Sequence, residues 1–162
     1  MRSTGLADEQ PAQADASDLY REVVLRHAKE PHNFGCLSSA THRADGINPL
    51  CGDKLRVYLE ISPEGRIDEI RFEGTGCAIS LASASLMTEA VERQLVTEAL
   101  AISERFSAAL DTGAGLGDSD LAALTAVRRY PSRVRCATLA WRALERAVAD
   151  TSDAATPTVT TE

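Results

Sequence analysis

The chain has 162 residues, of which 44% are hydrophobic and 25% are charged, so its length and composition fit one globular domain with a buried core. Its formal net charge of -7 argues against binding of nucleic acid through a general basic surface. No apolar run approaches the ~20 residues that cross a bilayer, and the N-terminus has no apolar signal core. We therefore expect a cytoplasmic protein without a membrane partner.

The two ends of the chain lack the periodicity of regular structure. Residues 1–17 are rich in Ala, Asp and Gln, and residues 150–162 are rich in Thr and Asp. Such polar segments bury too little apolar surface to offset the entropy of ordering. The sequence therefore predicts a disordered leader at 1–17, a single domain at 18–149 and a disordered tail at 150–162.

The first predicted element is a helix that begins near residue 18. It ends before Pro31, because a residue that precedes proline is pushed out of the helical region. Its apolar face carries residues at helical spacing, namely Leu19, Tyr20, Val23, Val24 and His27. We interpret His27 as a packed core residue, and His32 and His42 as exposed loop residues without a partner at metal-ligand spacing.

A hairpin is the clearest β pattern. Residues 54–61 alternate between apolar and polar side chains, and a turn at 62–65 leads into a returning strand at 66–73. Ile67 is out of phase with Ile70, which predicts a β-bulge. A weaker pattern at 40–46 indicates a third short strand.

Helices follow the hairpin. Small and apolar residues after Cys77 predict a closely packed helix in which Ser80, Ser83 and Ser85 are packing residues. Further helical patterns cover about 95–111, a short segment near 121–127 and a last helix at 136–149. The result is an α+β fold, in which a small antiparallel three-stranded sheet has its helices packed on one face.

Three of the four cysteines lie where a loop meets a regular element. Cys51 precedes the hairpin, Cys77 follows it, and Cys136 opens the last predicted helix, so all three can meet at one end of the sheet. With Asp53 they supply the four ligands that zinc prefers. The helix starts favour thiolate at Cys77 and Cys136. Cys36 lies alone in a loop, and we expect no role for it.

A structural interpretation competes with this one. Any one of these cysteines could be a buried packing residue, because free cysteine behaves as a small hydrophobe. All three are flanked by Gly, Asp, Pro or Arg, which favours a metal site. Such a site would be anionic, and the nearby basic residues Arg133, Arg135 and Lys54 are candidates to offset its charge.

At these cysteines the sequence resembles the U-type family of iron–sulfur assembly proteins, over about residues 18–149. The resemblance rests on several motifs in the family's order: Leu19-Tyr20, Pro31-His32-Asn33-Phe34-Gly35, Asn48-Pro49-Leu50-Cys51-Gly52-Asp53, Gly74-Thr75-Gly76-Cys77-Ala78-Ile79-Ser80 and Arg135-Cys136-Ala137-Thr138-Leu139-Ala140-Trp141. It implies a fold like that of the SufE/NifU proteins, with a metal site at one end.

Two branches of this family differ beside the third cysteine. The IscU-type scaffold has a histidine immediately before it, where this chain has Arg135. The SufU-type branch lacks that histidine and carries an extra segment, which residues 112–130 resemble. The resemblance therefore implies a zinc-dependent sulfurtransferase that works with a SufS-type cysteine desulfurase.

The resemblance also implies roles for individual residues. The implied zinc ligands are Cys51, Asp53, Cys77 and Cys136. Cys51 would also be the acceptor of persulfide sulfur, and Arg133 resembles the arginine that contacts the site when the partner is bound.

On this hypothesis, Cys51 accepts sulfur from a desulfurase persulfide, and this acceptance raises the turnover of the desulfurase. The sulfur then passes to a downstream Suf assembly scaffold. One alternative is a scaffold that assembles a [2Fe-2S] cluster or holds iron on the same ligands, because thiolates suit iron–sulfur clusters as well as zinc. A second alternative is a structural zinc adaptor.

Overall fold

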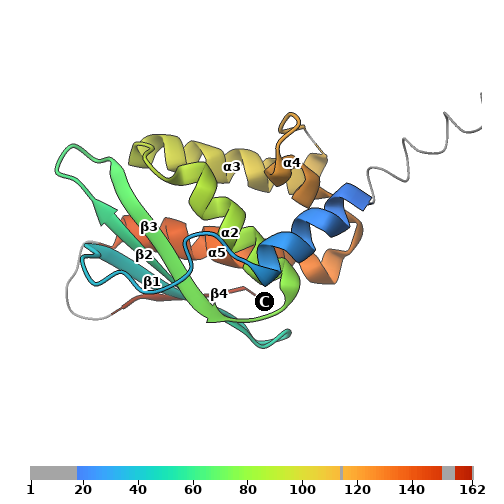
Figure 1. Ribbon diagram of the computed structural model, residues 1–162, viewed down its shortest axis with the longest axis horizontal. Coiled ribbons are helices and arrows are strands. Elements are labelled where there is room, and N and C mark those ends of the chain that lie inside the picture. Colours follow the sequence, from blue (N-terminus) through green and yellow to red (C-terminus); the bar gives the residue numbers. More distant parts are fainter. Residues whose placement is uncertain (1–17, 114, 151–155, 162) are drawn as a thin grey trace, which may run out of the picture.

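The structure, a computed structural model, describes residues 18–113, 115–150 and 156–161. It has a sheet layer with helices packed against it (Figure 1). The sheet has the strand order β3-β2-β1-β4 and consists of β1 (His42–Asn48), β2 (Asp53–Ile61), β3 (Ile67–Thr75) and β4 (Thr158–Thr160). The helices are an N-terminal helix at residues 18–29, α2 (Ala78–Val91), α3 (Val96–Thr112), α4 (Asp120–Leu124) with the 3-10 helix η1 (Thr125–Arg129), and α5 (Pro131–Ala149).

The predicted α+β class and the predicted antiparallel hairpin are confirmed. β2 pairs with both β1 and β3 in antiparallel register. The expected bulge lies beside the turn of the hairpin, where Glu60 pairs with Glu69 but Ile61 pairs with Ile67. Because the extra residue resets the side-chain phase, Ile67 and Ile70 are both fully buried.

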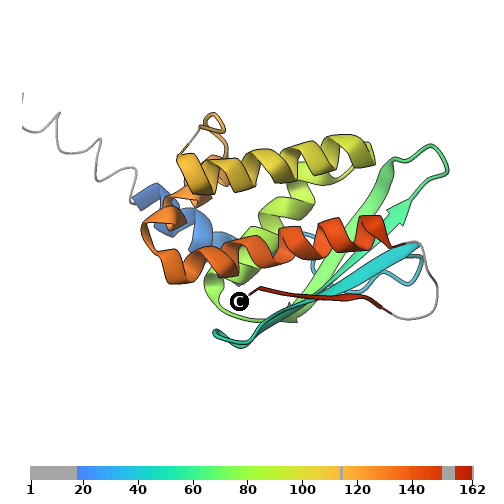
Figure 2. The same cartoon turned by 180° about the vertical axis from the view of Figure 1, so that it is seen from behind.

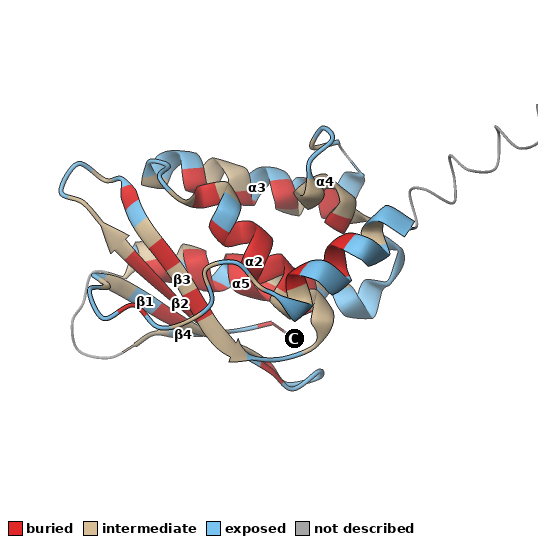
Figure 3. Ribbon diagram, in the orientation of Figure 1, coloured by how far each residue is buried: buried red, intermediate tan, exposed pale blue. Residues whose placement is uncertain are grey.

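α2 and α5 pack side by side against the sheet, and α3 lies outside them (Figure 2). Buried residues are concentrated along α2 and α5 and on the neighbouring strands (Figure 3). Trp141 on α5 stacks on Phe106 of α3 with ring centroids 4.9 Å apart, and its indole N–H donates to Ser83 Oγ at 3.1 Å. This core holds the ends of α2 and α5 beside the same end of the sheet.

The prediction of an unstructured tail does not hold for residues 156–161. Thr158–Thr160 forms β4, which pairs parallel to β1 and makes the sheet four-stranded and mixed rather than three-stranded and antiparallel. Thr161 N–H donates to Ile47 O at 3.0 Å, and Asp45 N–H donates to Pro157 O at 2.8 Å. A free edge of β1 offers unpaired backbone groups to such a strand, and a three-residue strand is too short to show alternation in the sequence.

The last helix also differs from its prediction. It begins at Pro131 rather than at 136. Proline has no backbone N–H, but at the first position of a helix that N–H would have no acceptor within the helix, so proline is tolerated there. Cys136 therefore lies in the second turn of α5 and not at the helix start. The leader predicted at 1–17 lies outside the described residues. Among the described helices, none is both long and apolar enough to cross a bilayer.

Candidate metal centre

The four predicted ligands come together from four parts of the chain. Cys51 lies on the turn between β1 and β2, Asp53 begins β2, Cys77 caps α2, and Cys136 lies on α5. Ligand atoms of Cys51, Asp53 and Cys136 all lie within 4.8 Å of one another, and Cys77 Sγ is 4.0 Å from Asp53 Oδ2. Cys136 and Cys51 are the tightest pair, with their sulfurs 3.2 Å apart. Three of the four predicted ligands thus form one group that could hold a metal ion, and Cys77 lies outside that group, next to Asp53.

Asp53 is the centre of a hydrogen-bond network. Its carboxylate is fully buried, accepts the Cys77 backbone N–H at 2.8 Å on Oδ1 and accepts the Ser80 hydroxyl at 2.7 Å on Oδ2. The side-chain amide of Asn48 donates to the same Oδ2 at 3.3 Å. Because a buried carboxylate is costly without such donors, these contacts fix its orientation toward the cysteines.

Asn48 links the carboxylate to the most buried cysteine. Its Nδ2 lies 3.5 Å from Cys136 Sγ, and both residues are fully buried. Its Oδ1 is the one buried side-chain oxygen or nitrogen of the described residues without a hydrogen-bond partner. A buried acceptor without a partner costs about 1–3 kcal/mol. Because Asn48 Oδ1 lies beside the predicted ligands, a group bound in the site can provide its missing partner.

Two glycines allow the chain before α2 to lie close to β2, one beside the Asp53 carboxylate and one beside the Lys54 backbone. A Cβ on Gly76 would lie 2.7 Å from Asp53 Oδ1. A Cβ on Gly74, which has a φ of +148°, would lie 2.1 Å from Lys54 O. Gly52 between Cys51 and Asp53 has a φ of +72°, which glycine adopts without strain. Side chains at 74 and 76 would therefore push β3 and α2 away from β2.

The electrostatics fit a cation. Burial raises the pKa of the Cys136 thiol far above its usual range, and the hydrogen bond with Cys51 and the neighbouring Cys77 and Asp53 add to this. The protein alone therefore keeps Cys136 protonated, whereas a bound cation favours the thiolate. Three cysteines and one carboxylate are a donor set for zinc or for an iron–sulfur centre. The residues present fit such a group.

Exposure separates the cysteines. Cys51 is exposed, Cys77 is half-buried and Cys136 is buried. Cys36 is exposed as well, but it belongs to neither group of metal-ligating side chains found among the described residues. The expectation that Cys36 is incidental stays a prediction.

Two residues of the site were not recognised in the sequence. Ser80 was interpreted as a packing residue, yet its hydroxyl bonds Asp53 and lies 3.8 Å from Cys77 Sγ. Its position three residues after the helix-capping Cys77 was the available signal, because that spacing places both side chains on one helix face. Asn48 carried a weaker signal, since it stands only three residues before Cys51.

Arg133 lies beside the centre rather than in it. It is exposed in the first turn of α5 and lines a cavity of about 430 Å³ together with Tyr20, Leu25, Ile79 and Tyr130. Burial raises the pKa of Tyr20, the charges of Tyr130, Cys77 and Cys136 add to the rise, and Arg133 opposes it. Tyr20 is thus close enough to sense both Arg133 and two of the cysteines, which places Arg133 near the centre.

Comparisons with known proteins agree with this geometry. Residues 19–156 match the family model described as the NifU-like N terminal domain. The zinc-dependent sulfurtransferase SufU of Bacillus subtilis is 40% identical over 141 residues, which cover 84% of this chain and 93% of the relative. The iron–sulfur cluster assembly scaffold protein IscU of Streptococcus pyogenes is 37% identical over 147 residues, covering 84% of this chain and 86% of the relative.

A solved structure is similar over nearly the same region. It is the crystal structure of a candidate iron–sulfur cluster assembly scaffold protein for the SUF system, from Fervidobacterium islandicum AW-1. It has a TM-score of 0.70 and 30% sequence identity, and the match covers 80% of this chain and 96% of that one.

Proposed function

This chain belongs to the family of NifU-like N-terminal domains, as an iron–sulfur cluster assembly protein of the IscU/SufU type, and we propose that it acts there as a zinc-dependent sulfurtransferase. Its partner is a SufS-type cysteine desulfurase, its sulfur acceptor is Cys51, and it passes sulfur to a downstream Suf assembly scaffold in the cytoplasm. The likeness to SufU supports this branch, as does Arg135 at the position where an IscU-type scaffold carries histidine.

The exposure of Cys51 carries the proposal. Cys51 lies on an outward turn whose neighbour Leu50 is 71% exposed, while Cys136 is fully buried. A persulfide held on the surface of another protein reaches Cys51 before any other sulfur of the centre. Cys77 and Cys136, which are anchored on helices, suit the role of fixed ligands.

The transfer is a thiol exchange. The Cys51 thiolate attacks the terminal sulfur of the desulfurase persulfide, and a new bond forms between Cys51 Sγ and that sulfur. The sulfur–sulfur bond of the desulfurase persulfide breaks, and its electron pair leaves on the desulfurase cysteine as thiolate. Cys51 becomes the persulfide, so no outside oxidant or reductant is needed. Zinc would be held by Cys51, Asp53, Cys77 and Cys136, and it would supply positive charge that favours ionised thiols.

Arg133 assists this exchange in our proposal. Arg133 is exposed near the centre, and its guanidinium can donate hydrogen bonds to a thiolate or to Asp53 once the partner docks. A hydrogen bond to a charged group contributes about 1.5–3 kcal/mol, so Arg133→Ala should slow sulfur transfer by roughly 10–100-fold. Arg129→Ala, an exposed arginine of η1, is the matched control and should transfer sulfur at the wild-type rate.

The direct test follows isotope-labelled sulfur from cysteine through the desulfurase. We expect label on the wild-type chain, none on Cys51→Ser, and wild-type labelling of Cys36→Ser, which loses another exposed cysteine. Desulfurase turnover without the chain gives the baseline. Label that persists on Cys51→Ser would show that the acceptor is a different residue.

A scaffold that carries a [2Fe-2S] cluster is the second candidate, favoured by the likeness to IscU proteins. The same donors suit both groups. Metal analysis of aerobically purified protein with its visible spectrum separates colourless zinc from a coloured cluster. A third candidate, a structural zinc adaptor, predicts zinc without any gain in desulfurase turnover.

A further inference from the structure

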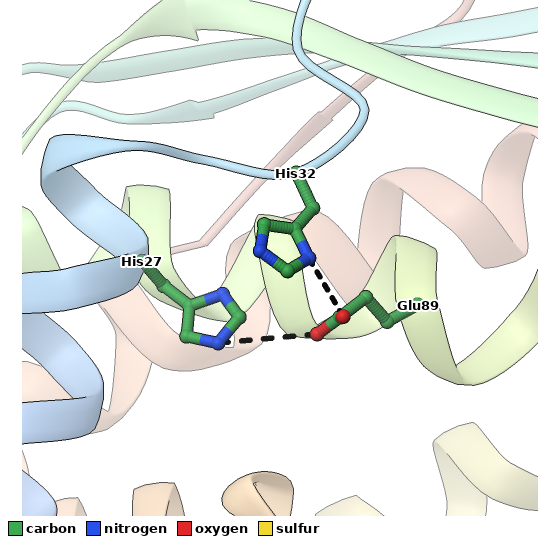
Figure 4. Close-up of side chains that lie close together, drawn as sticks. All are labelled: His27, His32 and Glu89. Atoms are coloured by element: carbon green, nitrogen blue, oxygen red, sulfur yellow. Dashed lines mark hydrogen bonds and ion pairs between the residues drawn. The ribbon is translucent and has the colours of Figure 1, made fainter.

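A second group of metal-ligating side chains lies away from the cysteine centre. His27 on the N-terminal helix, His32 on the loop that follows, and Glu89 on α2 point toward one another (Figure 4). Ligand atoms of this histidine cluster all lie within 4.8 Å of one another. The sequence predicts no partner for His32, because residues 32 and 89 are far apart in the chain and are brought together only by the fold. Cys77 and Glu89 mark opposite ends of α2, about 18 Å apart at the helical rise.

The ring of His27 is fixed in place by burial and by a contact with Ser85, as the rings of metal-binding histidines commonly are. Its side chain is 2% exposed, and its Nδ1 lies 2.7 Å from the hydroxyl of the fully buried Ser85. Ser85 Oγ also accepts the His32 backbone N–H at 2.8 Å, so one hydroxyl contacts both histidines. Histidines that bind metals are commonly oriented by a hydrogen bond at their other ring nitrogen. Nε2 of His27 faces Glu89.

The space in front of His27 Nε2 is wider than a hydrogen bond. Nε2 lies 3.9 Å from Glu89 Oε1 and 3.7 Å from Asp120 Oδ2, beyond the usual N–H···O range. Two ligands held about 2.1 Å from one tetrahedral ion are about 3.4 Å apart.

The charges around the cluster define its ligand set. Glu89 faces both rings, and its Oε2 lies 2.6 Å from His32 Nδ1. Asp120 Oδ2 is paired at 2.5 Å with Arg26, so we count it as a neighbour and not as a ligand. Two imidazoles and one carboxylate with a free position form the set found in catalytic zinc and non-haem Fe(II) sites.

An ion can reach this cluster from solvent. The side chains of His32 and Glu89 are 50% and 43% exposed. The short contact between them holds a proton that a metal would displace, as metal binding to histidine generally does.

We propose that His27, His32 and Glu89 form a second divalent-metal site, of the two-histidine and one-carboxylate type, that binds Zn²⁺ or Fe²⁺ separately from the cysteine centre. The site joins the N-terminal helix to α2. It does not depend on the sulfur-transfer proposal, because none of its ligands belongs to that centre.

The test is metal stoichiometry of the full chain, measured by equilibrium dialysis against buffered Zn²⁺ and, without oxygen, Fe²⁺. We expect a second ion on wild type and its loss in His32→Ala and Glu89→Gln, with the first ion retained. Loss of a residue that hydrogen-bonds a metal ligand typically weakens metal binding by ~10–100-fold. Ser85→Ala should therefore weaken binding at the second site by this factor. Removal of a ligand should weaken it by at least ~100-fold. His42→Ala, a histidine bonded to Thr41, is the control and should keep both ions.

Cobalt distinguishes the two sites by their ligands. A second equivalent of Co²⁺ should add visible bands without adding thiolate charge-transfer absorption, because the cluster contains no sulfur. Wild type that binds a single ion, or His32→Ala and Glu89→Gln chains that keep the second, would overturn the proposal. Second-site binding that fell equally in His42→Ala would overturn it too.

Discussion

Gly76→Ala tests whether the close approach of α2 to Asp53 holds the metal centre together. The new Cβ would lie 2.7 Å from Asp53 Oδ1 and 3.2 Å from Asp53 Cβ. Ordinary van der Waals contact begins near 3.4 Å, so the carboxylate must move by about 0.7 Å. Asp53 is fully buried and has little room to move.

The cost follows from the bonds that this shift lengthens. The Cys77 N–H and Ser80 hydroxyl contacts, at 2.8 and 2.7 Å, would stretch toward the limit of hydrogen bonding. Each charge-assisted bond contributes about 1.5–3 kcal/mol when intact. Partial loss of two such bonds, together with overpacking, gives an expected fall of about 1–3 kcal/mol in the free energy of unfolding. Misplacement of a ligand should also weaken zinc binding by ~10–100-fold.

The assay is urea unfolding of the metal-free chain together with zinc competition against a chelator. Gly115→Ala is the matched control, because a Cβ there meets nothing within 4 Å. The clash should shrink in the Asp53→Gly background, so a double-mutant cycle isolates the coupling between positions 53 and 76. A Gly76→Ala chain that unfolds and binds zinc like Gly115→Ala would refute the reasoning.

Three further predictions follow from the contacts described above. Ser80→Ala removes a donor to Asp53 and should weaken zinc binding by ~10–100-fold in chelator competition. Burial, and then the hydrogen bond to Glu73, raises the pKa of Tyr58 above 10.0, so the folded chain keeps a proton that the unfolded chain loses. The contribution of Tyr58 to the free energy of unfolding is fully present below pH 10. As the pH rises from there through the folded pKa, this free energy falls by at most ~1.4 kcal/mol per pH unit. The fall should be absent from Tyr58→Phe when urea unfolding is measured against pH. Deleting residues 156–162 removes β4 and should cost about 1–3 kcal/mol in urea unfolding, because backbone bonds to β1 are lost; an unchanged midpoint would contradict the role of that strand.

Local pattern accounts for most of the fold. Alternation located the hairpin, and the phase break at Ile67 located its bulge, because both signals lie within a few residues of chain. The last helix was predicted to begin at 136, but it begins five residues earlier at Pro131, since proline is compatible both with the end of a segment and with the first turn of a helix. β4 was missed because its stability comes from β1, more than a hundred residues away in sequence, and not from its own three residues.

The sequence by itself determined the chemistry of the metal centre. Thiol and carboxylate groups at loop–element junctions supply a donor set that suits a thiolate-preferring metal if the fold brings them together. Only the tertiary structure decided that Cys51 is exposed while Cys136 is buried, that Ser80 and Asn48 orient Asp53, and that two histidines meet Glu89. The physical reason is that burial and ligand geometry depend on contacts between distant segments, such as Asn48 with Cys136, 88 positions apart, which no local period encodes.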